Sequence, residues 1–351
     1  MLRQKAFKDN KFDGYAIFDP INLTYFAGIS GTSALLLPKD DESIVFVYGT
    51  NYEMAKAEGE GFRVEKVKSG EKLMDRIANQ AETFHAKHLA FDKLDVESWQ
   101  ALAKSFGDKS KLTANGSLVR DLRKVKDEKE IKLMRKAAEL ASLGMKVAYE
   151  TLEPGWKEKD VAAEIEYAMR KQGSDGTSFE TSVASAASSA YPHGGCSDRK
   201  IREGDLVVVD LGAKYKFYCS DITRTLVAGK PSDKQMRLYQ IVQKAYEKAF
   251  ETIKPDAKGS DVDGAGRKTI EEAGYGEYFV HGLGHGVGLE VHEPPTLSIS
   301  SKDILAAGNV VTDEPGIYLI GYGGIRVEDT VLVTKTGAEK LTEAPYKLNA
   351  H

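Results

Sequence analysis

Short apolar runs alternate with amphipathic stretches in the first third of the chain. The runs at residues 15–18, 33–37 and 44–48 are rich in Leu, Ile, Val and aromatic side chains, which is typical of buried β-strands. Residues 52–58 and 72–84 instead repeat apolar side chains at helical spacing. The pattern therefore predicts an α/β domain.

The pattern changes at residues 117–139, where apolar positions are interleaved with many charges. We expect this stretch to be a linker that runs into a long amphipathic helix, with Arg120–Lys132 on its solvated face. We place the domain boundary there, so that residues 1–122 form an N-terminal domain and residues 123–351 a C-terminal domain. Two domains also suit the length of the chain.

The C-terminal domain repeats an order of two helices followed by strands, which favours two similar halves. We expect helices near residues 128–150, 158–172, 233–253 and 260–273, and strands within residues 181–184, 206–227 and 310–332.

Composition excludes several classes of protein. Hydrophobic residues make up 41% of the 351 residues and charged residues 29%, so disorder and fibrous repeats do not fit. The net charge of −4 offers no positive field that would attract nucleic acid. The chain also contains no run of 18 apolar residues, so no membrane span is predicted. Two cysteines, Cys196 and Cys219, are too few for a disulfide framework, and the polar start at Met1–Asp13 does not resemble a secretory signal. We expect a cytoplasmic protein.

The first chemical signal is a pair of aspartates in a predicted hairpin. The apolar run Leu206–Val209 ends at Asp210, and a second alternating run returns through Asp221. A turn centred between Tyr215 and Lys216 would place the two aspartates directly opposite each other, with Cβ atoms about 4.5–5.5 Å apart. Such like charges repel unless a cation lies between them.

The second predicted hairpin repeats this arrangement with glutamates. A turn centred on Gly321 would place Glu314 opposite Glu328. The string His281–Gly288 alternates glycine with other residues, so we expect a tight strand and turn that brings His285 close to the carboxylates. One histidine with four carboxylates suits two divalent ions such as Mn²⁺, Co²⁺ or Fe²⁺, with Zn²⁺ as a further candidate. Two such ions can activate water and polarise a carbonyl, which indicates a hydrolase.

Together these motifs resemble the M24B metallopeptidases with the pita-bread fold, which include Xaa-Pro aminopeptidases and Xaa-Pro dipeptidases (prolidases). Asn22–Gly28 and the strands after it resemble the creatinase-type N-terminal domain of this family. The resemblance implies an α/β (α+β) protein, in which a creatinase-like N-terminal α/β domain precedes a pseudo-symmetric pita-bread catalytic domain. The residues that match the family's metal ligands are Asp210, Asp221, His285, Glu314 and Glu328.

The resemblance also implies a role for each of these ligands. Asp210 would hold one ion, His285 and Glu314 the other, and Asp221 and Glu328 would bridge the two. Glu314 would also move a proton from the attacking water to the leaving amine.

Four further residues match active-site positions of the family. His193 and His292 resemble the two histidines that contact substrate and stabilise the tetrahedral intermediate. His281 would line the pocket, and Arg326 would support Asp210 or the substrate.

Three departures from the family pattern bear on specificity. Ala186–Ser189 stand where prolidases usually have Gly-His-Arg-Ser, and Pro294–Thr296 stand where archaeal prolidases often carry an arginine that holds the dipeptide's carboxylate. Losing that anchor removes a feature that penalises longer peptides. Asp313 stands where the family prefers an apolar residue, and the sequence does not predict its effect on metal affinity.

These features favour a dinuclear metal-dependent aminopeptidase that releases the N-terminal residue from short peptides and is not restricted to Xaa-Pro. The alternatives are a strict Xaa-Pro dipeptidase, a C–N hydrolase resembling creatinase, and a non-enzymatic pita-bread binding module. The resemblance further implies that the N-terminal domain mediates homodimerisation and narrows access to the site, with a higher homo-oligomer left open.

Overall fold

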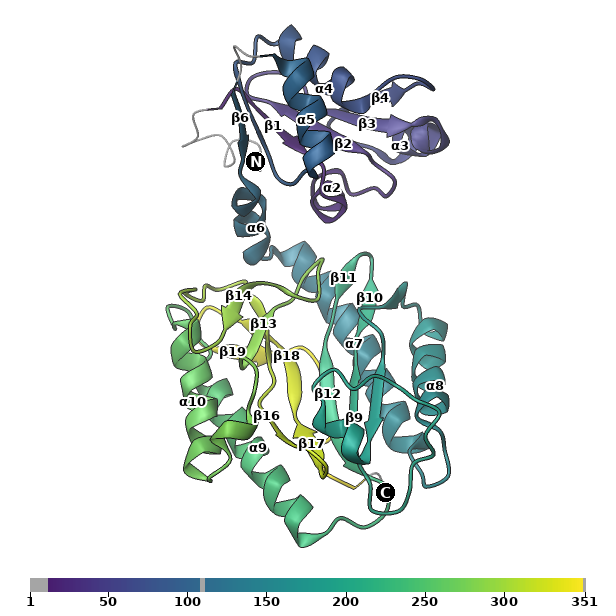
Figure 1. Cartoon of the computed structure of the whole chain (residues 1–351), viewed down its shortest axis with the longest axis vertical. Helices are drawn as coiled ribbons and strands as arrows, with labels where there is room; N and C mark the ends of the chain where they lie inside the picture. Colours follow the sequence, from purple (N-terminus) through teal and green to yellow (C-terminus); the bar gives the residue numbers. More distant parts are fainter. Residues whose placement is uncertain (1–11, 108–110, 350–351) are drawn as a thin grey trace. The chain divides into compact units, whose positions relative to one another are not determined.

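Figure 1 shows the computed structural model of the chain, which describes residues 12–107 and 111–349. The chain divides into two compact units, Met1–Leu122 and Arg123–His351. Residues 1–11, which carry most of the stretch that did not resemble a secretory signal, lie outside the described residues. Among the helices that the structure describes, none is long and apolar enough to cross a membrane.

The N-terminal unit is built on a mixed sheet with the strand order β4-β3-β2-β1-β5-β6. Alternate residues of β1–β3 enter two separate apolar clusters, so both faces of the sheet are buried and the strands read as continuous apolar runs. The predicted strands and helices of this unit are confirmed to within one residue at each end. Its elements are β1 (Gly14–Ile17), α2 (Pro20–Ala27), β2 (Ala34–Pro38), β3 (Ile44–Tyr48), α3 (Tyr52–Glu58), β4 (Arg63–Val67), α4 (Leu73–Thr83), β5 (His88–Phe91), α5 (Val96–Phe106) and β6 (Lys111–Ala114).

The C-terminal unit consists of two halves around one main sheet (Figure 1). One apolar cluster packs α7 and α8 on the strands of the first half, and another packs α9 and α10 on those of the second. The predicted helix pairs are confirmed, and capping boxes at Asp127 and Ser232 explain where α7 and α9 begin. The helices are α7 (Glu128–Thr151), α8 (Glu158–Lys171), α9 (Asp233–Thr252) and α10 (Gly259–Glu272).

The main sheet has the strand order β14-β13-β15-β18-β12-β9-β8, and β19 pairs with β18. Shorter ladders join β7, β10 and β11, and β16 with β17. The strands are β7 (Gly176–Thr177), β8 (Ser182–Ser185), β9 (Leu206–Leu211), β10 (Ala213–Tyr215), β11 (Tyr218–Cys219), β12 (Ile222–Val227), β13 (Gly284–Gly286), β14 (Glu293–Leu297), β15 (Val310–Asp313), β16 (Gly316–Leu319), β17 (Gly323–Arg326), β18 (Glu328–Val333) and β19 (Ala338–Lys340).

The predicted register of the first hairpin is wrong. Asp210 pairs with Thr223, not with Asp221. The turn residues are Lys216 and Phe217, both with positive φ, and they move the centre of the hairpin one residue along the chain. Neither is Gly, Asn or Asp, so the sequence carried no signal for this turn.

The predicted register of the second hairpin is confirmed. Asp313 pairs with Asp329 in the ladder of β15 and β18, and Gly316 pairs with Arg326 in the ladder of β16 and β17. Both pairings belong to a hairpin centred on Gly321, which has the positive φ that a glycine tolerates.

The expected solvated face of Arg120–Lys132 is also wrong in part. This segment contains the end of α6 (Gly116–Lys124) and the start of α7, and two cations point inward, Arg123 in the last turn of α6 and Lys126 in the break between the helices. Arg123 donates to Glu293, and Lys126 Nζ lies 2.7 Å from Glu293 Oε1. The side chains of Lys126 and Glu293 are only 1% and 2% exposed, so a buried acid on β14 outweighs the local preference of the cations for solvent.

Substitution of Glu293 by glutamine is expected to lower the free energy of unfolding by about 3 kcal/mol, because it removes the counter-charge of buried Lys126 and the buried one of the two carboxylates that pair with Arg123. Burial already lowers the pKa of Lys126, and Glu293 opposes that effect. Glu290 is the matched control: it also pairs with Arg123, at 2.7 Å, but its side chain is 43% exposed. Glu290→Gln should cost under about 1 kcal/mol. Equal losses in urea unfolding would contradict this account.

Asp313 is a fully buried carboxylate on β15. Neither of its oxygens has a hydrogen-bond partner among the described residues, and Asp329 lies directly opposite on β18. Asp263 on α10 is equally buried, but it accepts two hydrogen bonds from Arg267 and one from the backbone N–H of Leu283. Replacement of these two buried aspartates by an apolar residue is therefore expected to change stability in opposite directions.

We expect Asp313→Val to raise the free energy of unfolding by about 1–3 kcal/mol, because an apolar side chain replaces a buried polar group without partners. The same substitution at Asp263 should lower the free energy of unfolding by about 3 kcal/mol, since it leaves the guanidinium of Arg267 without its carboxylate partner. Thermal unfolding of both variants without added metal measures the difference. Destabilisation by Asp313→Val would show that this carboxylate has a partner of its own.

Candidate metal centre

Five neighbouring strands of the main sheet each bring one predicted ligand to the site. Asp210 lies on β9, His285 on β13, and Glu328 is the first residue of β18. Asp221 directly precedes β12, and Glu314 directly follows β15. Because the order of these strands is β13-β15-β18-β12-β9, residues far apart in the sequence converge.

The side chains lie within reach of shared ions. His285 Nε2 is 3.1 Å from Glu314 Oε1 and 3.8 Å from Asp221 Oδ2. Asp221, His285 and Glu328 each offer a ligand atom within 4.8 Å of one another. Asp210 is joined to this group through the ladder, because Thr223 pairs with Asp210 on one side and with Glu328 on the other.

A cavity of about 320 Å³ opens over these ligands. Every residue that the sequence analysis assigned to the site lines it, including the four that are not candidate ligands. Those four are His193, His281, His292 and Arg326, and the remaining lining residues are Phe179, Pro192, Gly282 and Gly284.

Burial and mutual repulsion oppose the ionisation of three carboxyls. Burial first, and then the charges of Glu328 and Asp210, raise the pKa of Asp221 well above its ordinary value. Burial and the charge of Glu314 do the same to the pKa of Glu328. Burial also raises the pKa of Asp210, although Arg326 opposes this. A divalent cation among these groups would offset both costs.

Glu314 and His285 have the opposite balance. Burial opposes ionisation of Glu314, but the hydrogen bond and charge of His285 outweigh it and lower the pKa of Glu314 to about 2. His285 Nδ1 lies 3.1 Å from the carbonyl oxygen of Gly286, which can only accept, so Nδ1 carries the proton. Nε2 faces the carboxylates and, without a metal, donates its proton to Glu314 Oε1, so an ion bound here would replace that proton and take the Nε2 lone pair.

The donor set fits two divalent ions. Four carboxylates and one imidazole nitrogen form the oxygen-rich group that hard or borderline cations prefer. Asp210 Oδ1 is buried and has no hydrogen-bond partner among the described residues, so it is a further free acceptor.

Arg326 contacts Asp210 and a tyrosine. Its Nη2 donates to Asp210 Oδ2 at 2.6 Å, and its Nη1 donates to the hydroxyl of Tyr318 at 2.8 Å. The Tyr318 hydroxyl lies 2.8 Å from His281 Nε2, and His281 Nδ1 lies 2.7 Å from the carbonyl oxygen of Gly282. Nδ1 is therefore the donor, and Tyr318 donates to His281 Nε2.

The two further histidines, His193 and His292, both line the cavity. The ring of His292 packs on that of His285, with centroids 4.0 Å apart. Burial, and then the charge of His285, lower the pKa of His292, which favours its neutral form. His193 belongs to the loop after the short 3₁₀ helix Ala186–Ala190.

Three supporting residues were not assigned by the sequence analysis. Thr223 Oγ1 donates to Glu328 Oε2 at 2.5 Å. Thr312 Oγ1 accepts from the backbone N–H of His285 and donates to Glu314 Oε1, both at 3.0 Å. The third is Tyr318. Strand alternation could have identified the two threonines from the sequence. Thr223 and Thr312 each lie two residues from a candidate ligand, so each shares a face of its strand with that ligand.

Comparison with known proteins covers both units. The sequence profile of metallopeptidase family M24 matches residues 132–335, and that of the creatinase/prolidase N-terminal domain matches residues 3–125. The chain is 39% identical to the Xaa-Pro dipeptidase of Pyrococcus furiosus over 350 residues, which cover 98% of this chain and 97% of the relative.

Solved structures give the same result. The Xaa-Pro dipeptidase from Bacillus anthracis superimposes with a TM-score of 0.94 at 37% identity, over 99% of this chain and 98% of that one. The X-Pro aminopeptidase from Thermotoga maritima superimposes with a TM-score of 0.90 at 34% identity, over 98% of this chain and 99% of that one.

The fold and the matches identify a hydrolase of peptide bonds with the pita-bread fold, preceded by a creatinase-type domain. The chain belongs to metallopeptidase family M24. The family resemblance and the fold class predicted from the sequence are thereby confirmed, and the non-enzymatic and creatinase-like alternatives are wrong.

Proposed function

We propose that this chain is an Xaa-Pro dipeptidase that requires two divalent metal ions. Its similarity over nearly the full length to the Xaa-Pro dipeptidase of P. furiosus carries the proposal. That similarity favours the narrower activity over the broader aminopeptidase that the sequence analysis placed first. The cavity of about 320 Å³ lies at the small end of ligand pockets, about 300–1,000 Å³, which supports a dipeptide-sized substrate.

The ligand set supports the metal requirement. Asp210 would hold one ion, His285 and Glu314 the other, and Asp221 and Glu328 would bridge them. Mn²⁺, Co²⁺ and Fe²⁺ suit these donors, with Zn²⁺ as a further candidate. When bound, such ions supply Lewis-acid polarisation of the scissile carbonyl and lower the pKa of the attacking water.

Glu314 would transfer the proton. Its Oε1 already accepts a hydrogen bond from Thr312, so Oε2 is the oxygen that would accept a proton from the attacking water. The nitrogen of an Xaa-Pro bond carries no hydrogen, and it must gain a proton to leave as the secondary amine of proline. Glu314 Oε2 would deliver that proton.

His193 and His292 would donate hydrogen bonds to the oxyanion of the tetrahedral intermediate, where fixed donors act most strongly. The lowered pKa of His292 favours a neutral imidazole, which can still donate through one ring nitrogen. Arg326 would hold Asp210 in place, and Tyr318 would hold His281 at the wall of the cavity.

An aminopeptidase acting on longer peptides is the second candidate. Residues Pro294–Thr296 of β14 include no arginine that could hold the carboxylate of a dipeptide. A longer peptide, whose carboxylate lies elsewhere, therefore loses no ion pair at that position. The similarity to the X-Pro aminopeptidase from T. maritima also favours this reading.

Three peptides separate the candidates. With Mn²⁺ present, we expect turnover of Leu-Pro, and kcat/KM at least about 100-fold lower for Leu-Pro-Gly and for Leu-Ala. Release of leucine from Leu-Pro-Gly at a rate similar to that from Leu-Pro would favour the aminopeptidase. Rapid hydrolysis of Leu-Ala would exclude a requirement for proline.

We also propose that the chain forms a homodimer, by itself or as part of a higher homo-oligomer, in which the N-terminal unit mediates the contact between copies. Light scattering with size exclusion measures the assembly directly, and a monomer would contradict this part. We propose a cytoplasmic location because Cys196 and Cys219 are both free thiols.

A further inference from the structure

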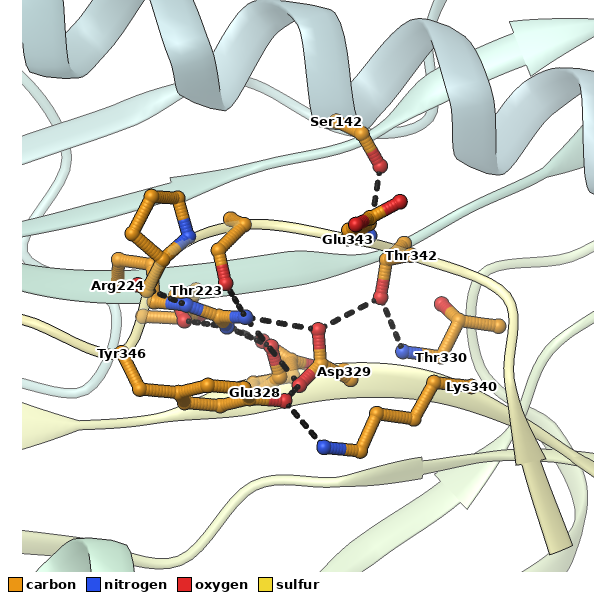
Figure 2. A network of polar contacts seen from close by, with 12 residues as sticks. Ser142, Thr223, Arg224, Glu328, Asp329, Thr330, Lys340, Thr342, Glu343 and Tyr346 are labelled. Carbon is orange, nitrogen blue, oxygen red and sulfur yellow. Dashed lines mark hydrogen bonds and ion pairs between the residues drawn. The ribbon is translucent and has the colours of Figure 1, made fainter.

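Arg224 lies behind the metal centre, on the opposite face of β12. It is fully buried, and its neighbour Thr223 directs its hydroxyl to Glu328 in the site. Because side chains alternate along a strand, the guanidinium points to the reverse face of the sheet. Figure 2 shows the guanidinium beside Asp329 and above the ring of Tyr346.

The guanidinium holds the backbone at two positions of the site. Its Nη1 donates to the carbonyl oxygens of Thr223, at 3.0 Å, and of Glu328, at 2.6 Å. Thr223 and Glu328 are paired in the ladder between β12 and β18, and Asp329, the next residue of β18, binds Nη2 at 3.0 Å. Arg224 therefore ties together the two strands at the row that carries Glu328.

Residues 341–348 complete this arrangement, and we call them the C-terminal strap. Arg224 Nη2 donates to the carbonyl oxygen of Ala344, and Nε to that of Pro345, each at 3.2 Å. The hydroxyl of Tyr346 donates to Asp329 Oδ2 at 2.5 Å (Figure 2). The strap itself is anchored on β12, where the backbone N–H of Val227 donates to Leu348.

All five N–H donors of the guanidinium can thus be used: two by the carbonyls of Thr223 and Glu328, two by Asp329 and Ala344, and one by Pro345. A buried charge satisfied on every donor is rigid, because loss of any contact leaves a polar group unpaired. No other side chain offers five donors in one plane, so lysine could replace only part of this set.

We propose that Arg224 is a positioning residue for the metal centre, and that it acts together with the C-terminal strap. By fixing the backbone at Thr223 and Glu328 from behind, it holds the carboxylate of Glu328 where an ion binds. This inference rests on the proposed function, in which Glu328 is a metal ligand. Residues that orient ligands typically contribute about 10- to 100-fold in metal affinity.

The test measures the Kd for Mn²⁺ by calorimetry on the full chain, stripped of metal, together with thermal unfolding. Arg224→Gln is expected to weaken binding by about 10- to 100-fold. Arg224→Lys should recover part of this affinity. Tyr346→Phe, which removes the hydroxyl that contacts Asp329, Tyr246 and Lys340 but leaves Arg224 in place, should have a smaller effect. Ile165→Ala is the control for general destabilisation, because Ile165 packs on α7 at Gly144 in the apolar core.

The variants separate positioning from stability. Ile165→Ala should lower the unfolding temperature and leave the Kd unchanged. If Arg224→Gln does not fold, the comparison rests on Arg224→Lys and Tyr346→Phe, and wild-type affinity in both overturns the inference. Absence of Mn²⁺ binding by the wild-type chain would overturn the proposed function instead, so the two failures are distinguishable.

Discussion

Asp221→Asn is expected to lower kcat/KM for Leu-Pro by about 1,000-fold. Two ions supply several kcal/mol of transition-state stabilisation, and each 1.4 kcal/mol corresponds to a factor of ten. The amide keeps the shape of the side chain but removes the charge that would bridge the ions. We expect the variant to bind fewer than two Mn²⁺ ions per chain, which metal analysis after dialysis measures.

The same substitution should stabilise the metal-free protein. Burial and the charges of Glu328 and Asp210 raise the pKa of Asp221, so its ionised form is costly in the empty site. Without metal, the variant should unfold at a higher temperature than the wild type, and it should gain less from added Mn²⁺. This reversal distinguishes a lost ligand from a damaged fold.

Asp198→Asn is the control, because its carboxylate is 73% exposed and its ion pairs with Lys157 and Lys159 are weak. It should change neither activity nor metal content. Wild-type metal content in Asp221→Asn, together with wild-type activity, would remove Asp221 from the proposed ligand set.

His292→Ala is expected to lower kcat for Leu-Pro by about 100- to 1,000-fold, the usual cost of losing an oxyanion donor. KM should change by only a few-fold, because this hydrogen bond strengthens in the transition state. Metal content should stay at two ions per chain, since His292 is not a proposed ligand. Steady-state kinetics and metal analysis on the same preparation provide both measurements.

His85 provides the matched histidine control. It is exposed in the N-terminal unit and has a positive φ, so asparagine is the conservative replacement. His85→Asn should retain wild-type kinetics. A large rise in KM for His292→Ala with kcat unchanged would assign His292 to substrate binding alone.

Position, rather than residue type, separates groups of the same chemistry in this chain. Glu290 and Glu293 both pair with Arg123, but only Glu293 is enclosed with it. Asp263 and Asp313 are equally buried, but only Asp263 has partners among the described residues. The energetic value of a carboxylate here depends on its surroundings, which is why its neighbours in space must be known before its effect is assigned.

The sequence by itself determined the helices, the strands and the candidate ligands. Apolar periodicity is a local property, so elements such as residues 44–48 and 52–58 could be predicted without knowledge of their neighbours. Carboxylates at the ends of buried strands, as at Asp210 and Glu314, conflict with the surrounding apolar pattern, and that conflict pointed to a cation. The glycine at the centre of the second hairpin also made its register predictable.

Only the tertiary structure decided the contacts between distant residues. The turn at Lys216 and Phe217 places Thr223 opposite Asp210, and its position could not be predicted because neither residue is one that usually marks such a turn. Arg224 meets the C-terminal strap more than 100 residues further along the chain. Such pairings depend on how strands order in a sheet and how segments pack on it, and the hydrophobic pattern of one segment carries no record of its partner.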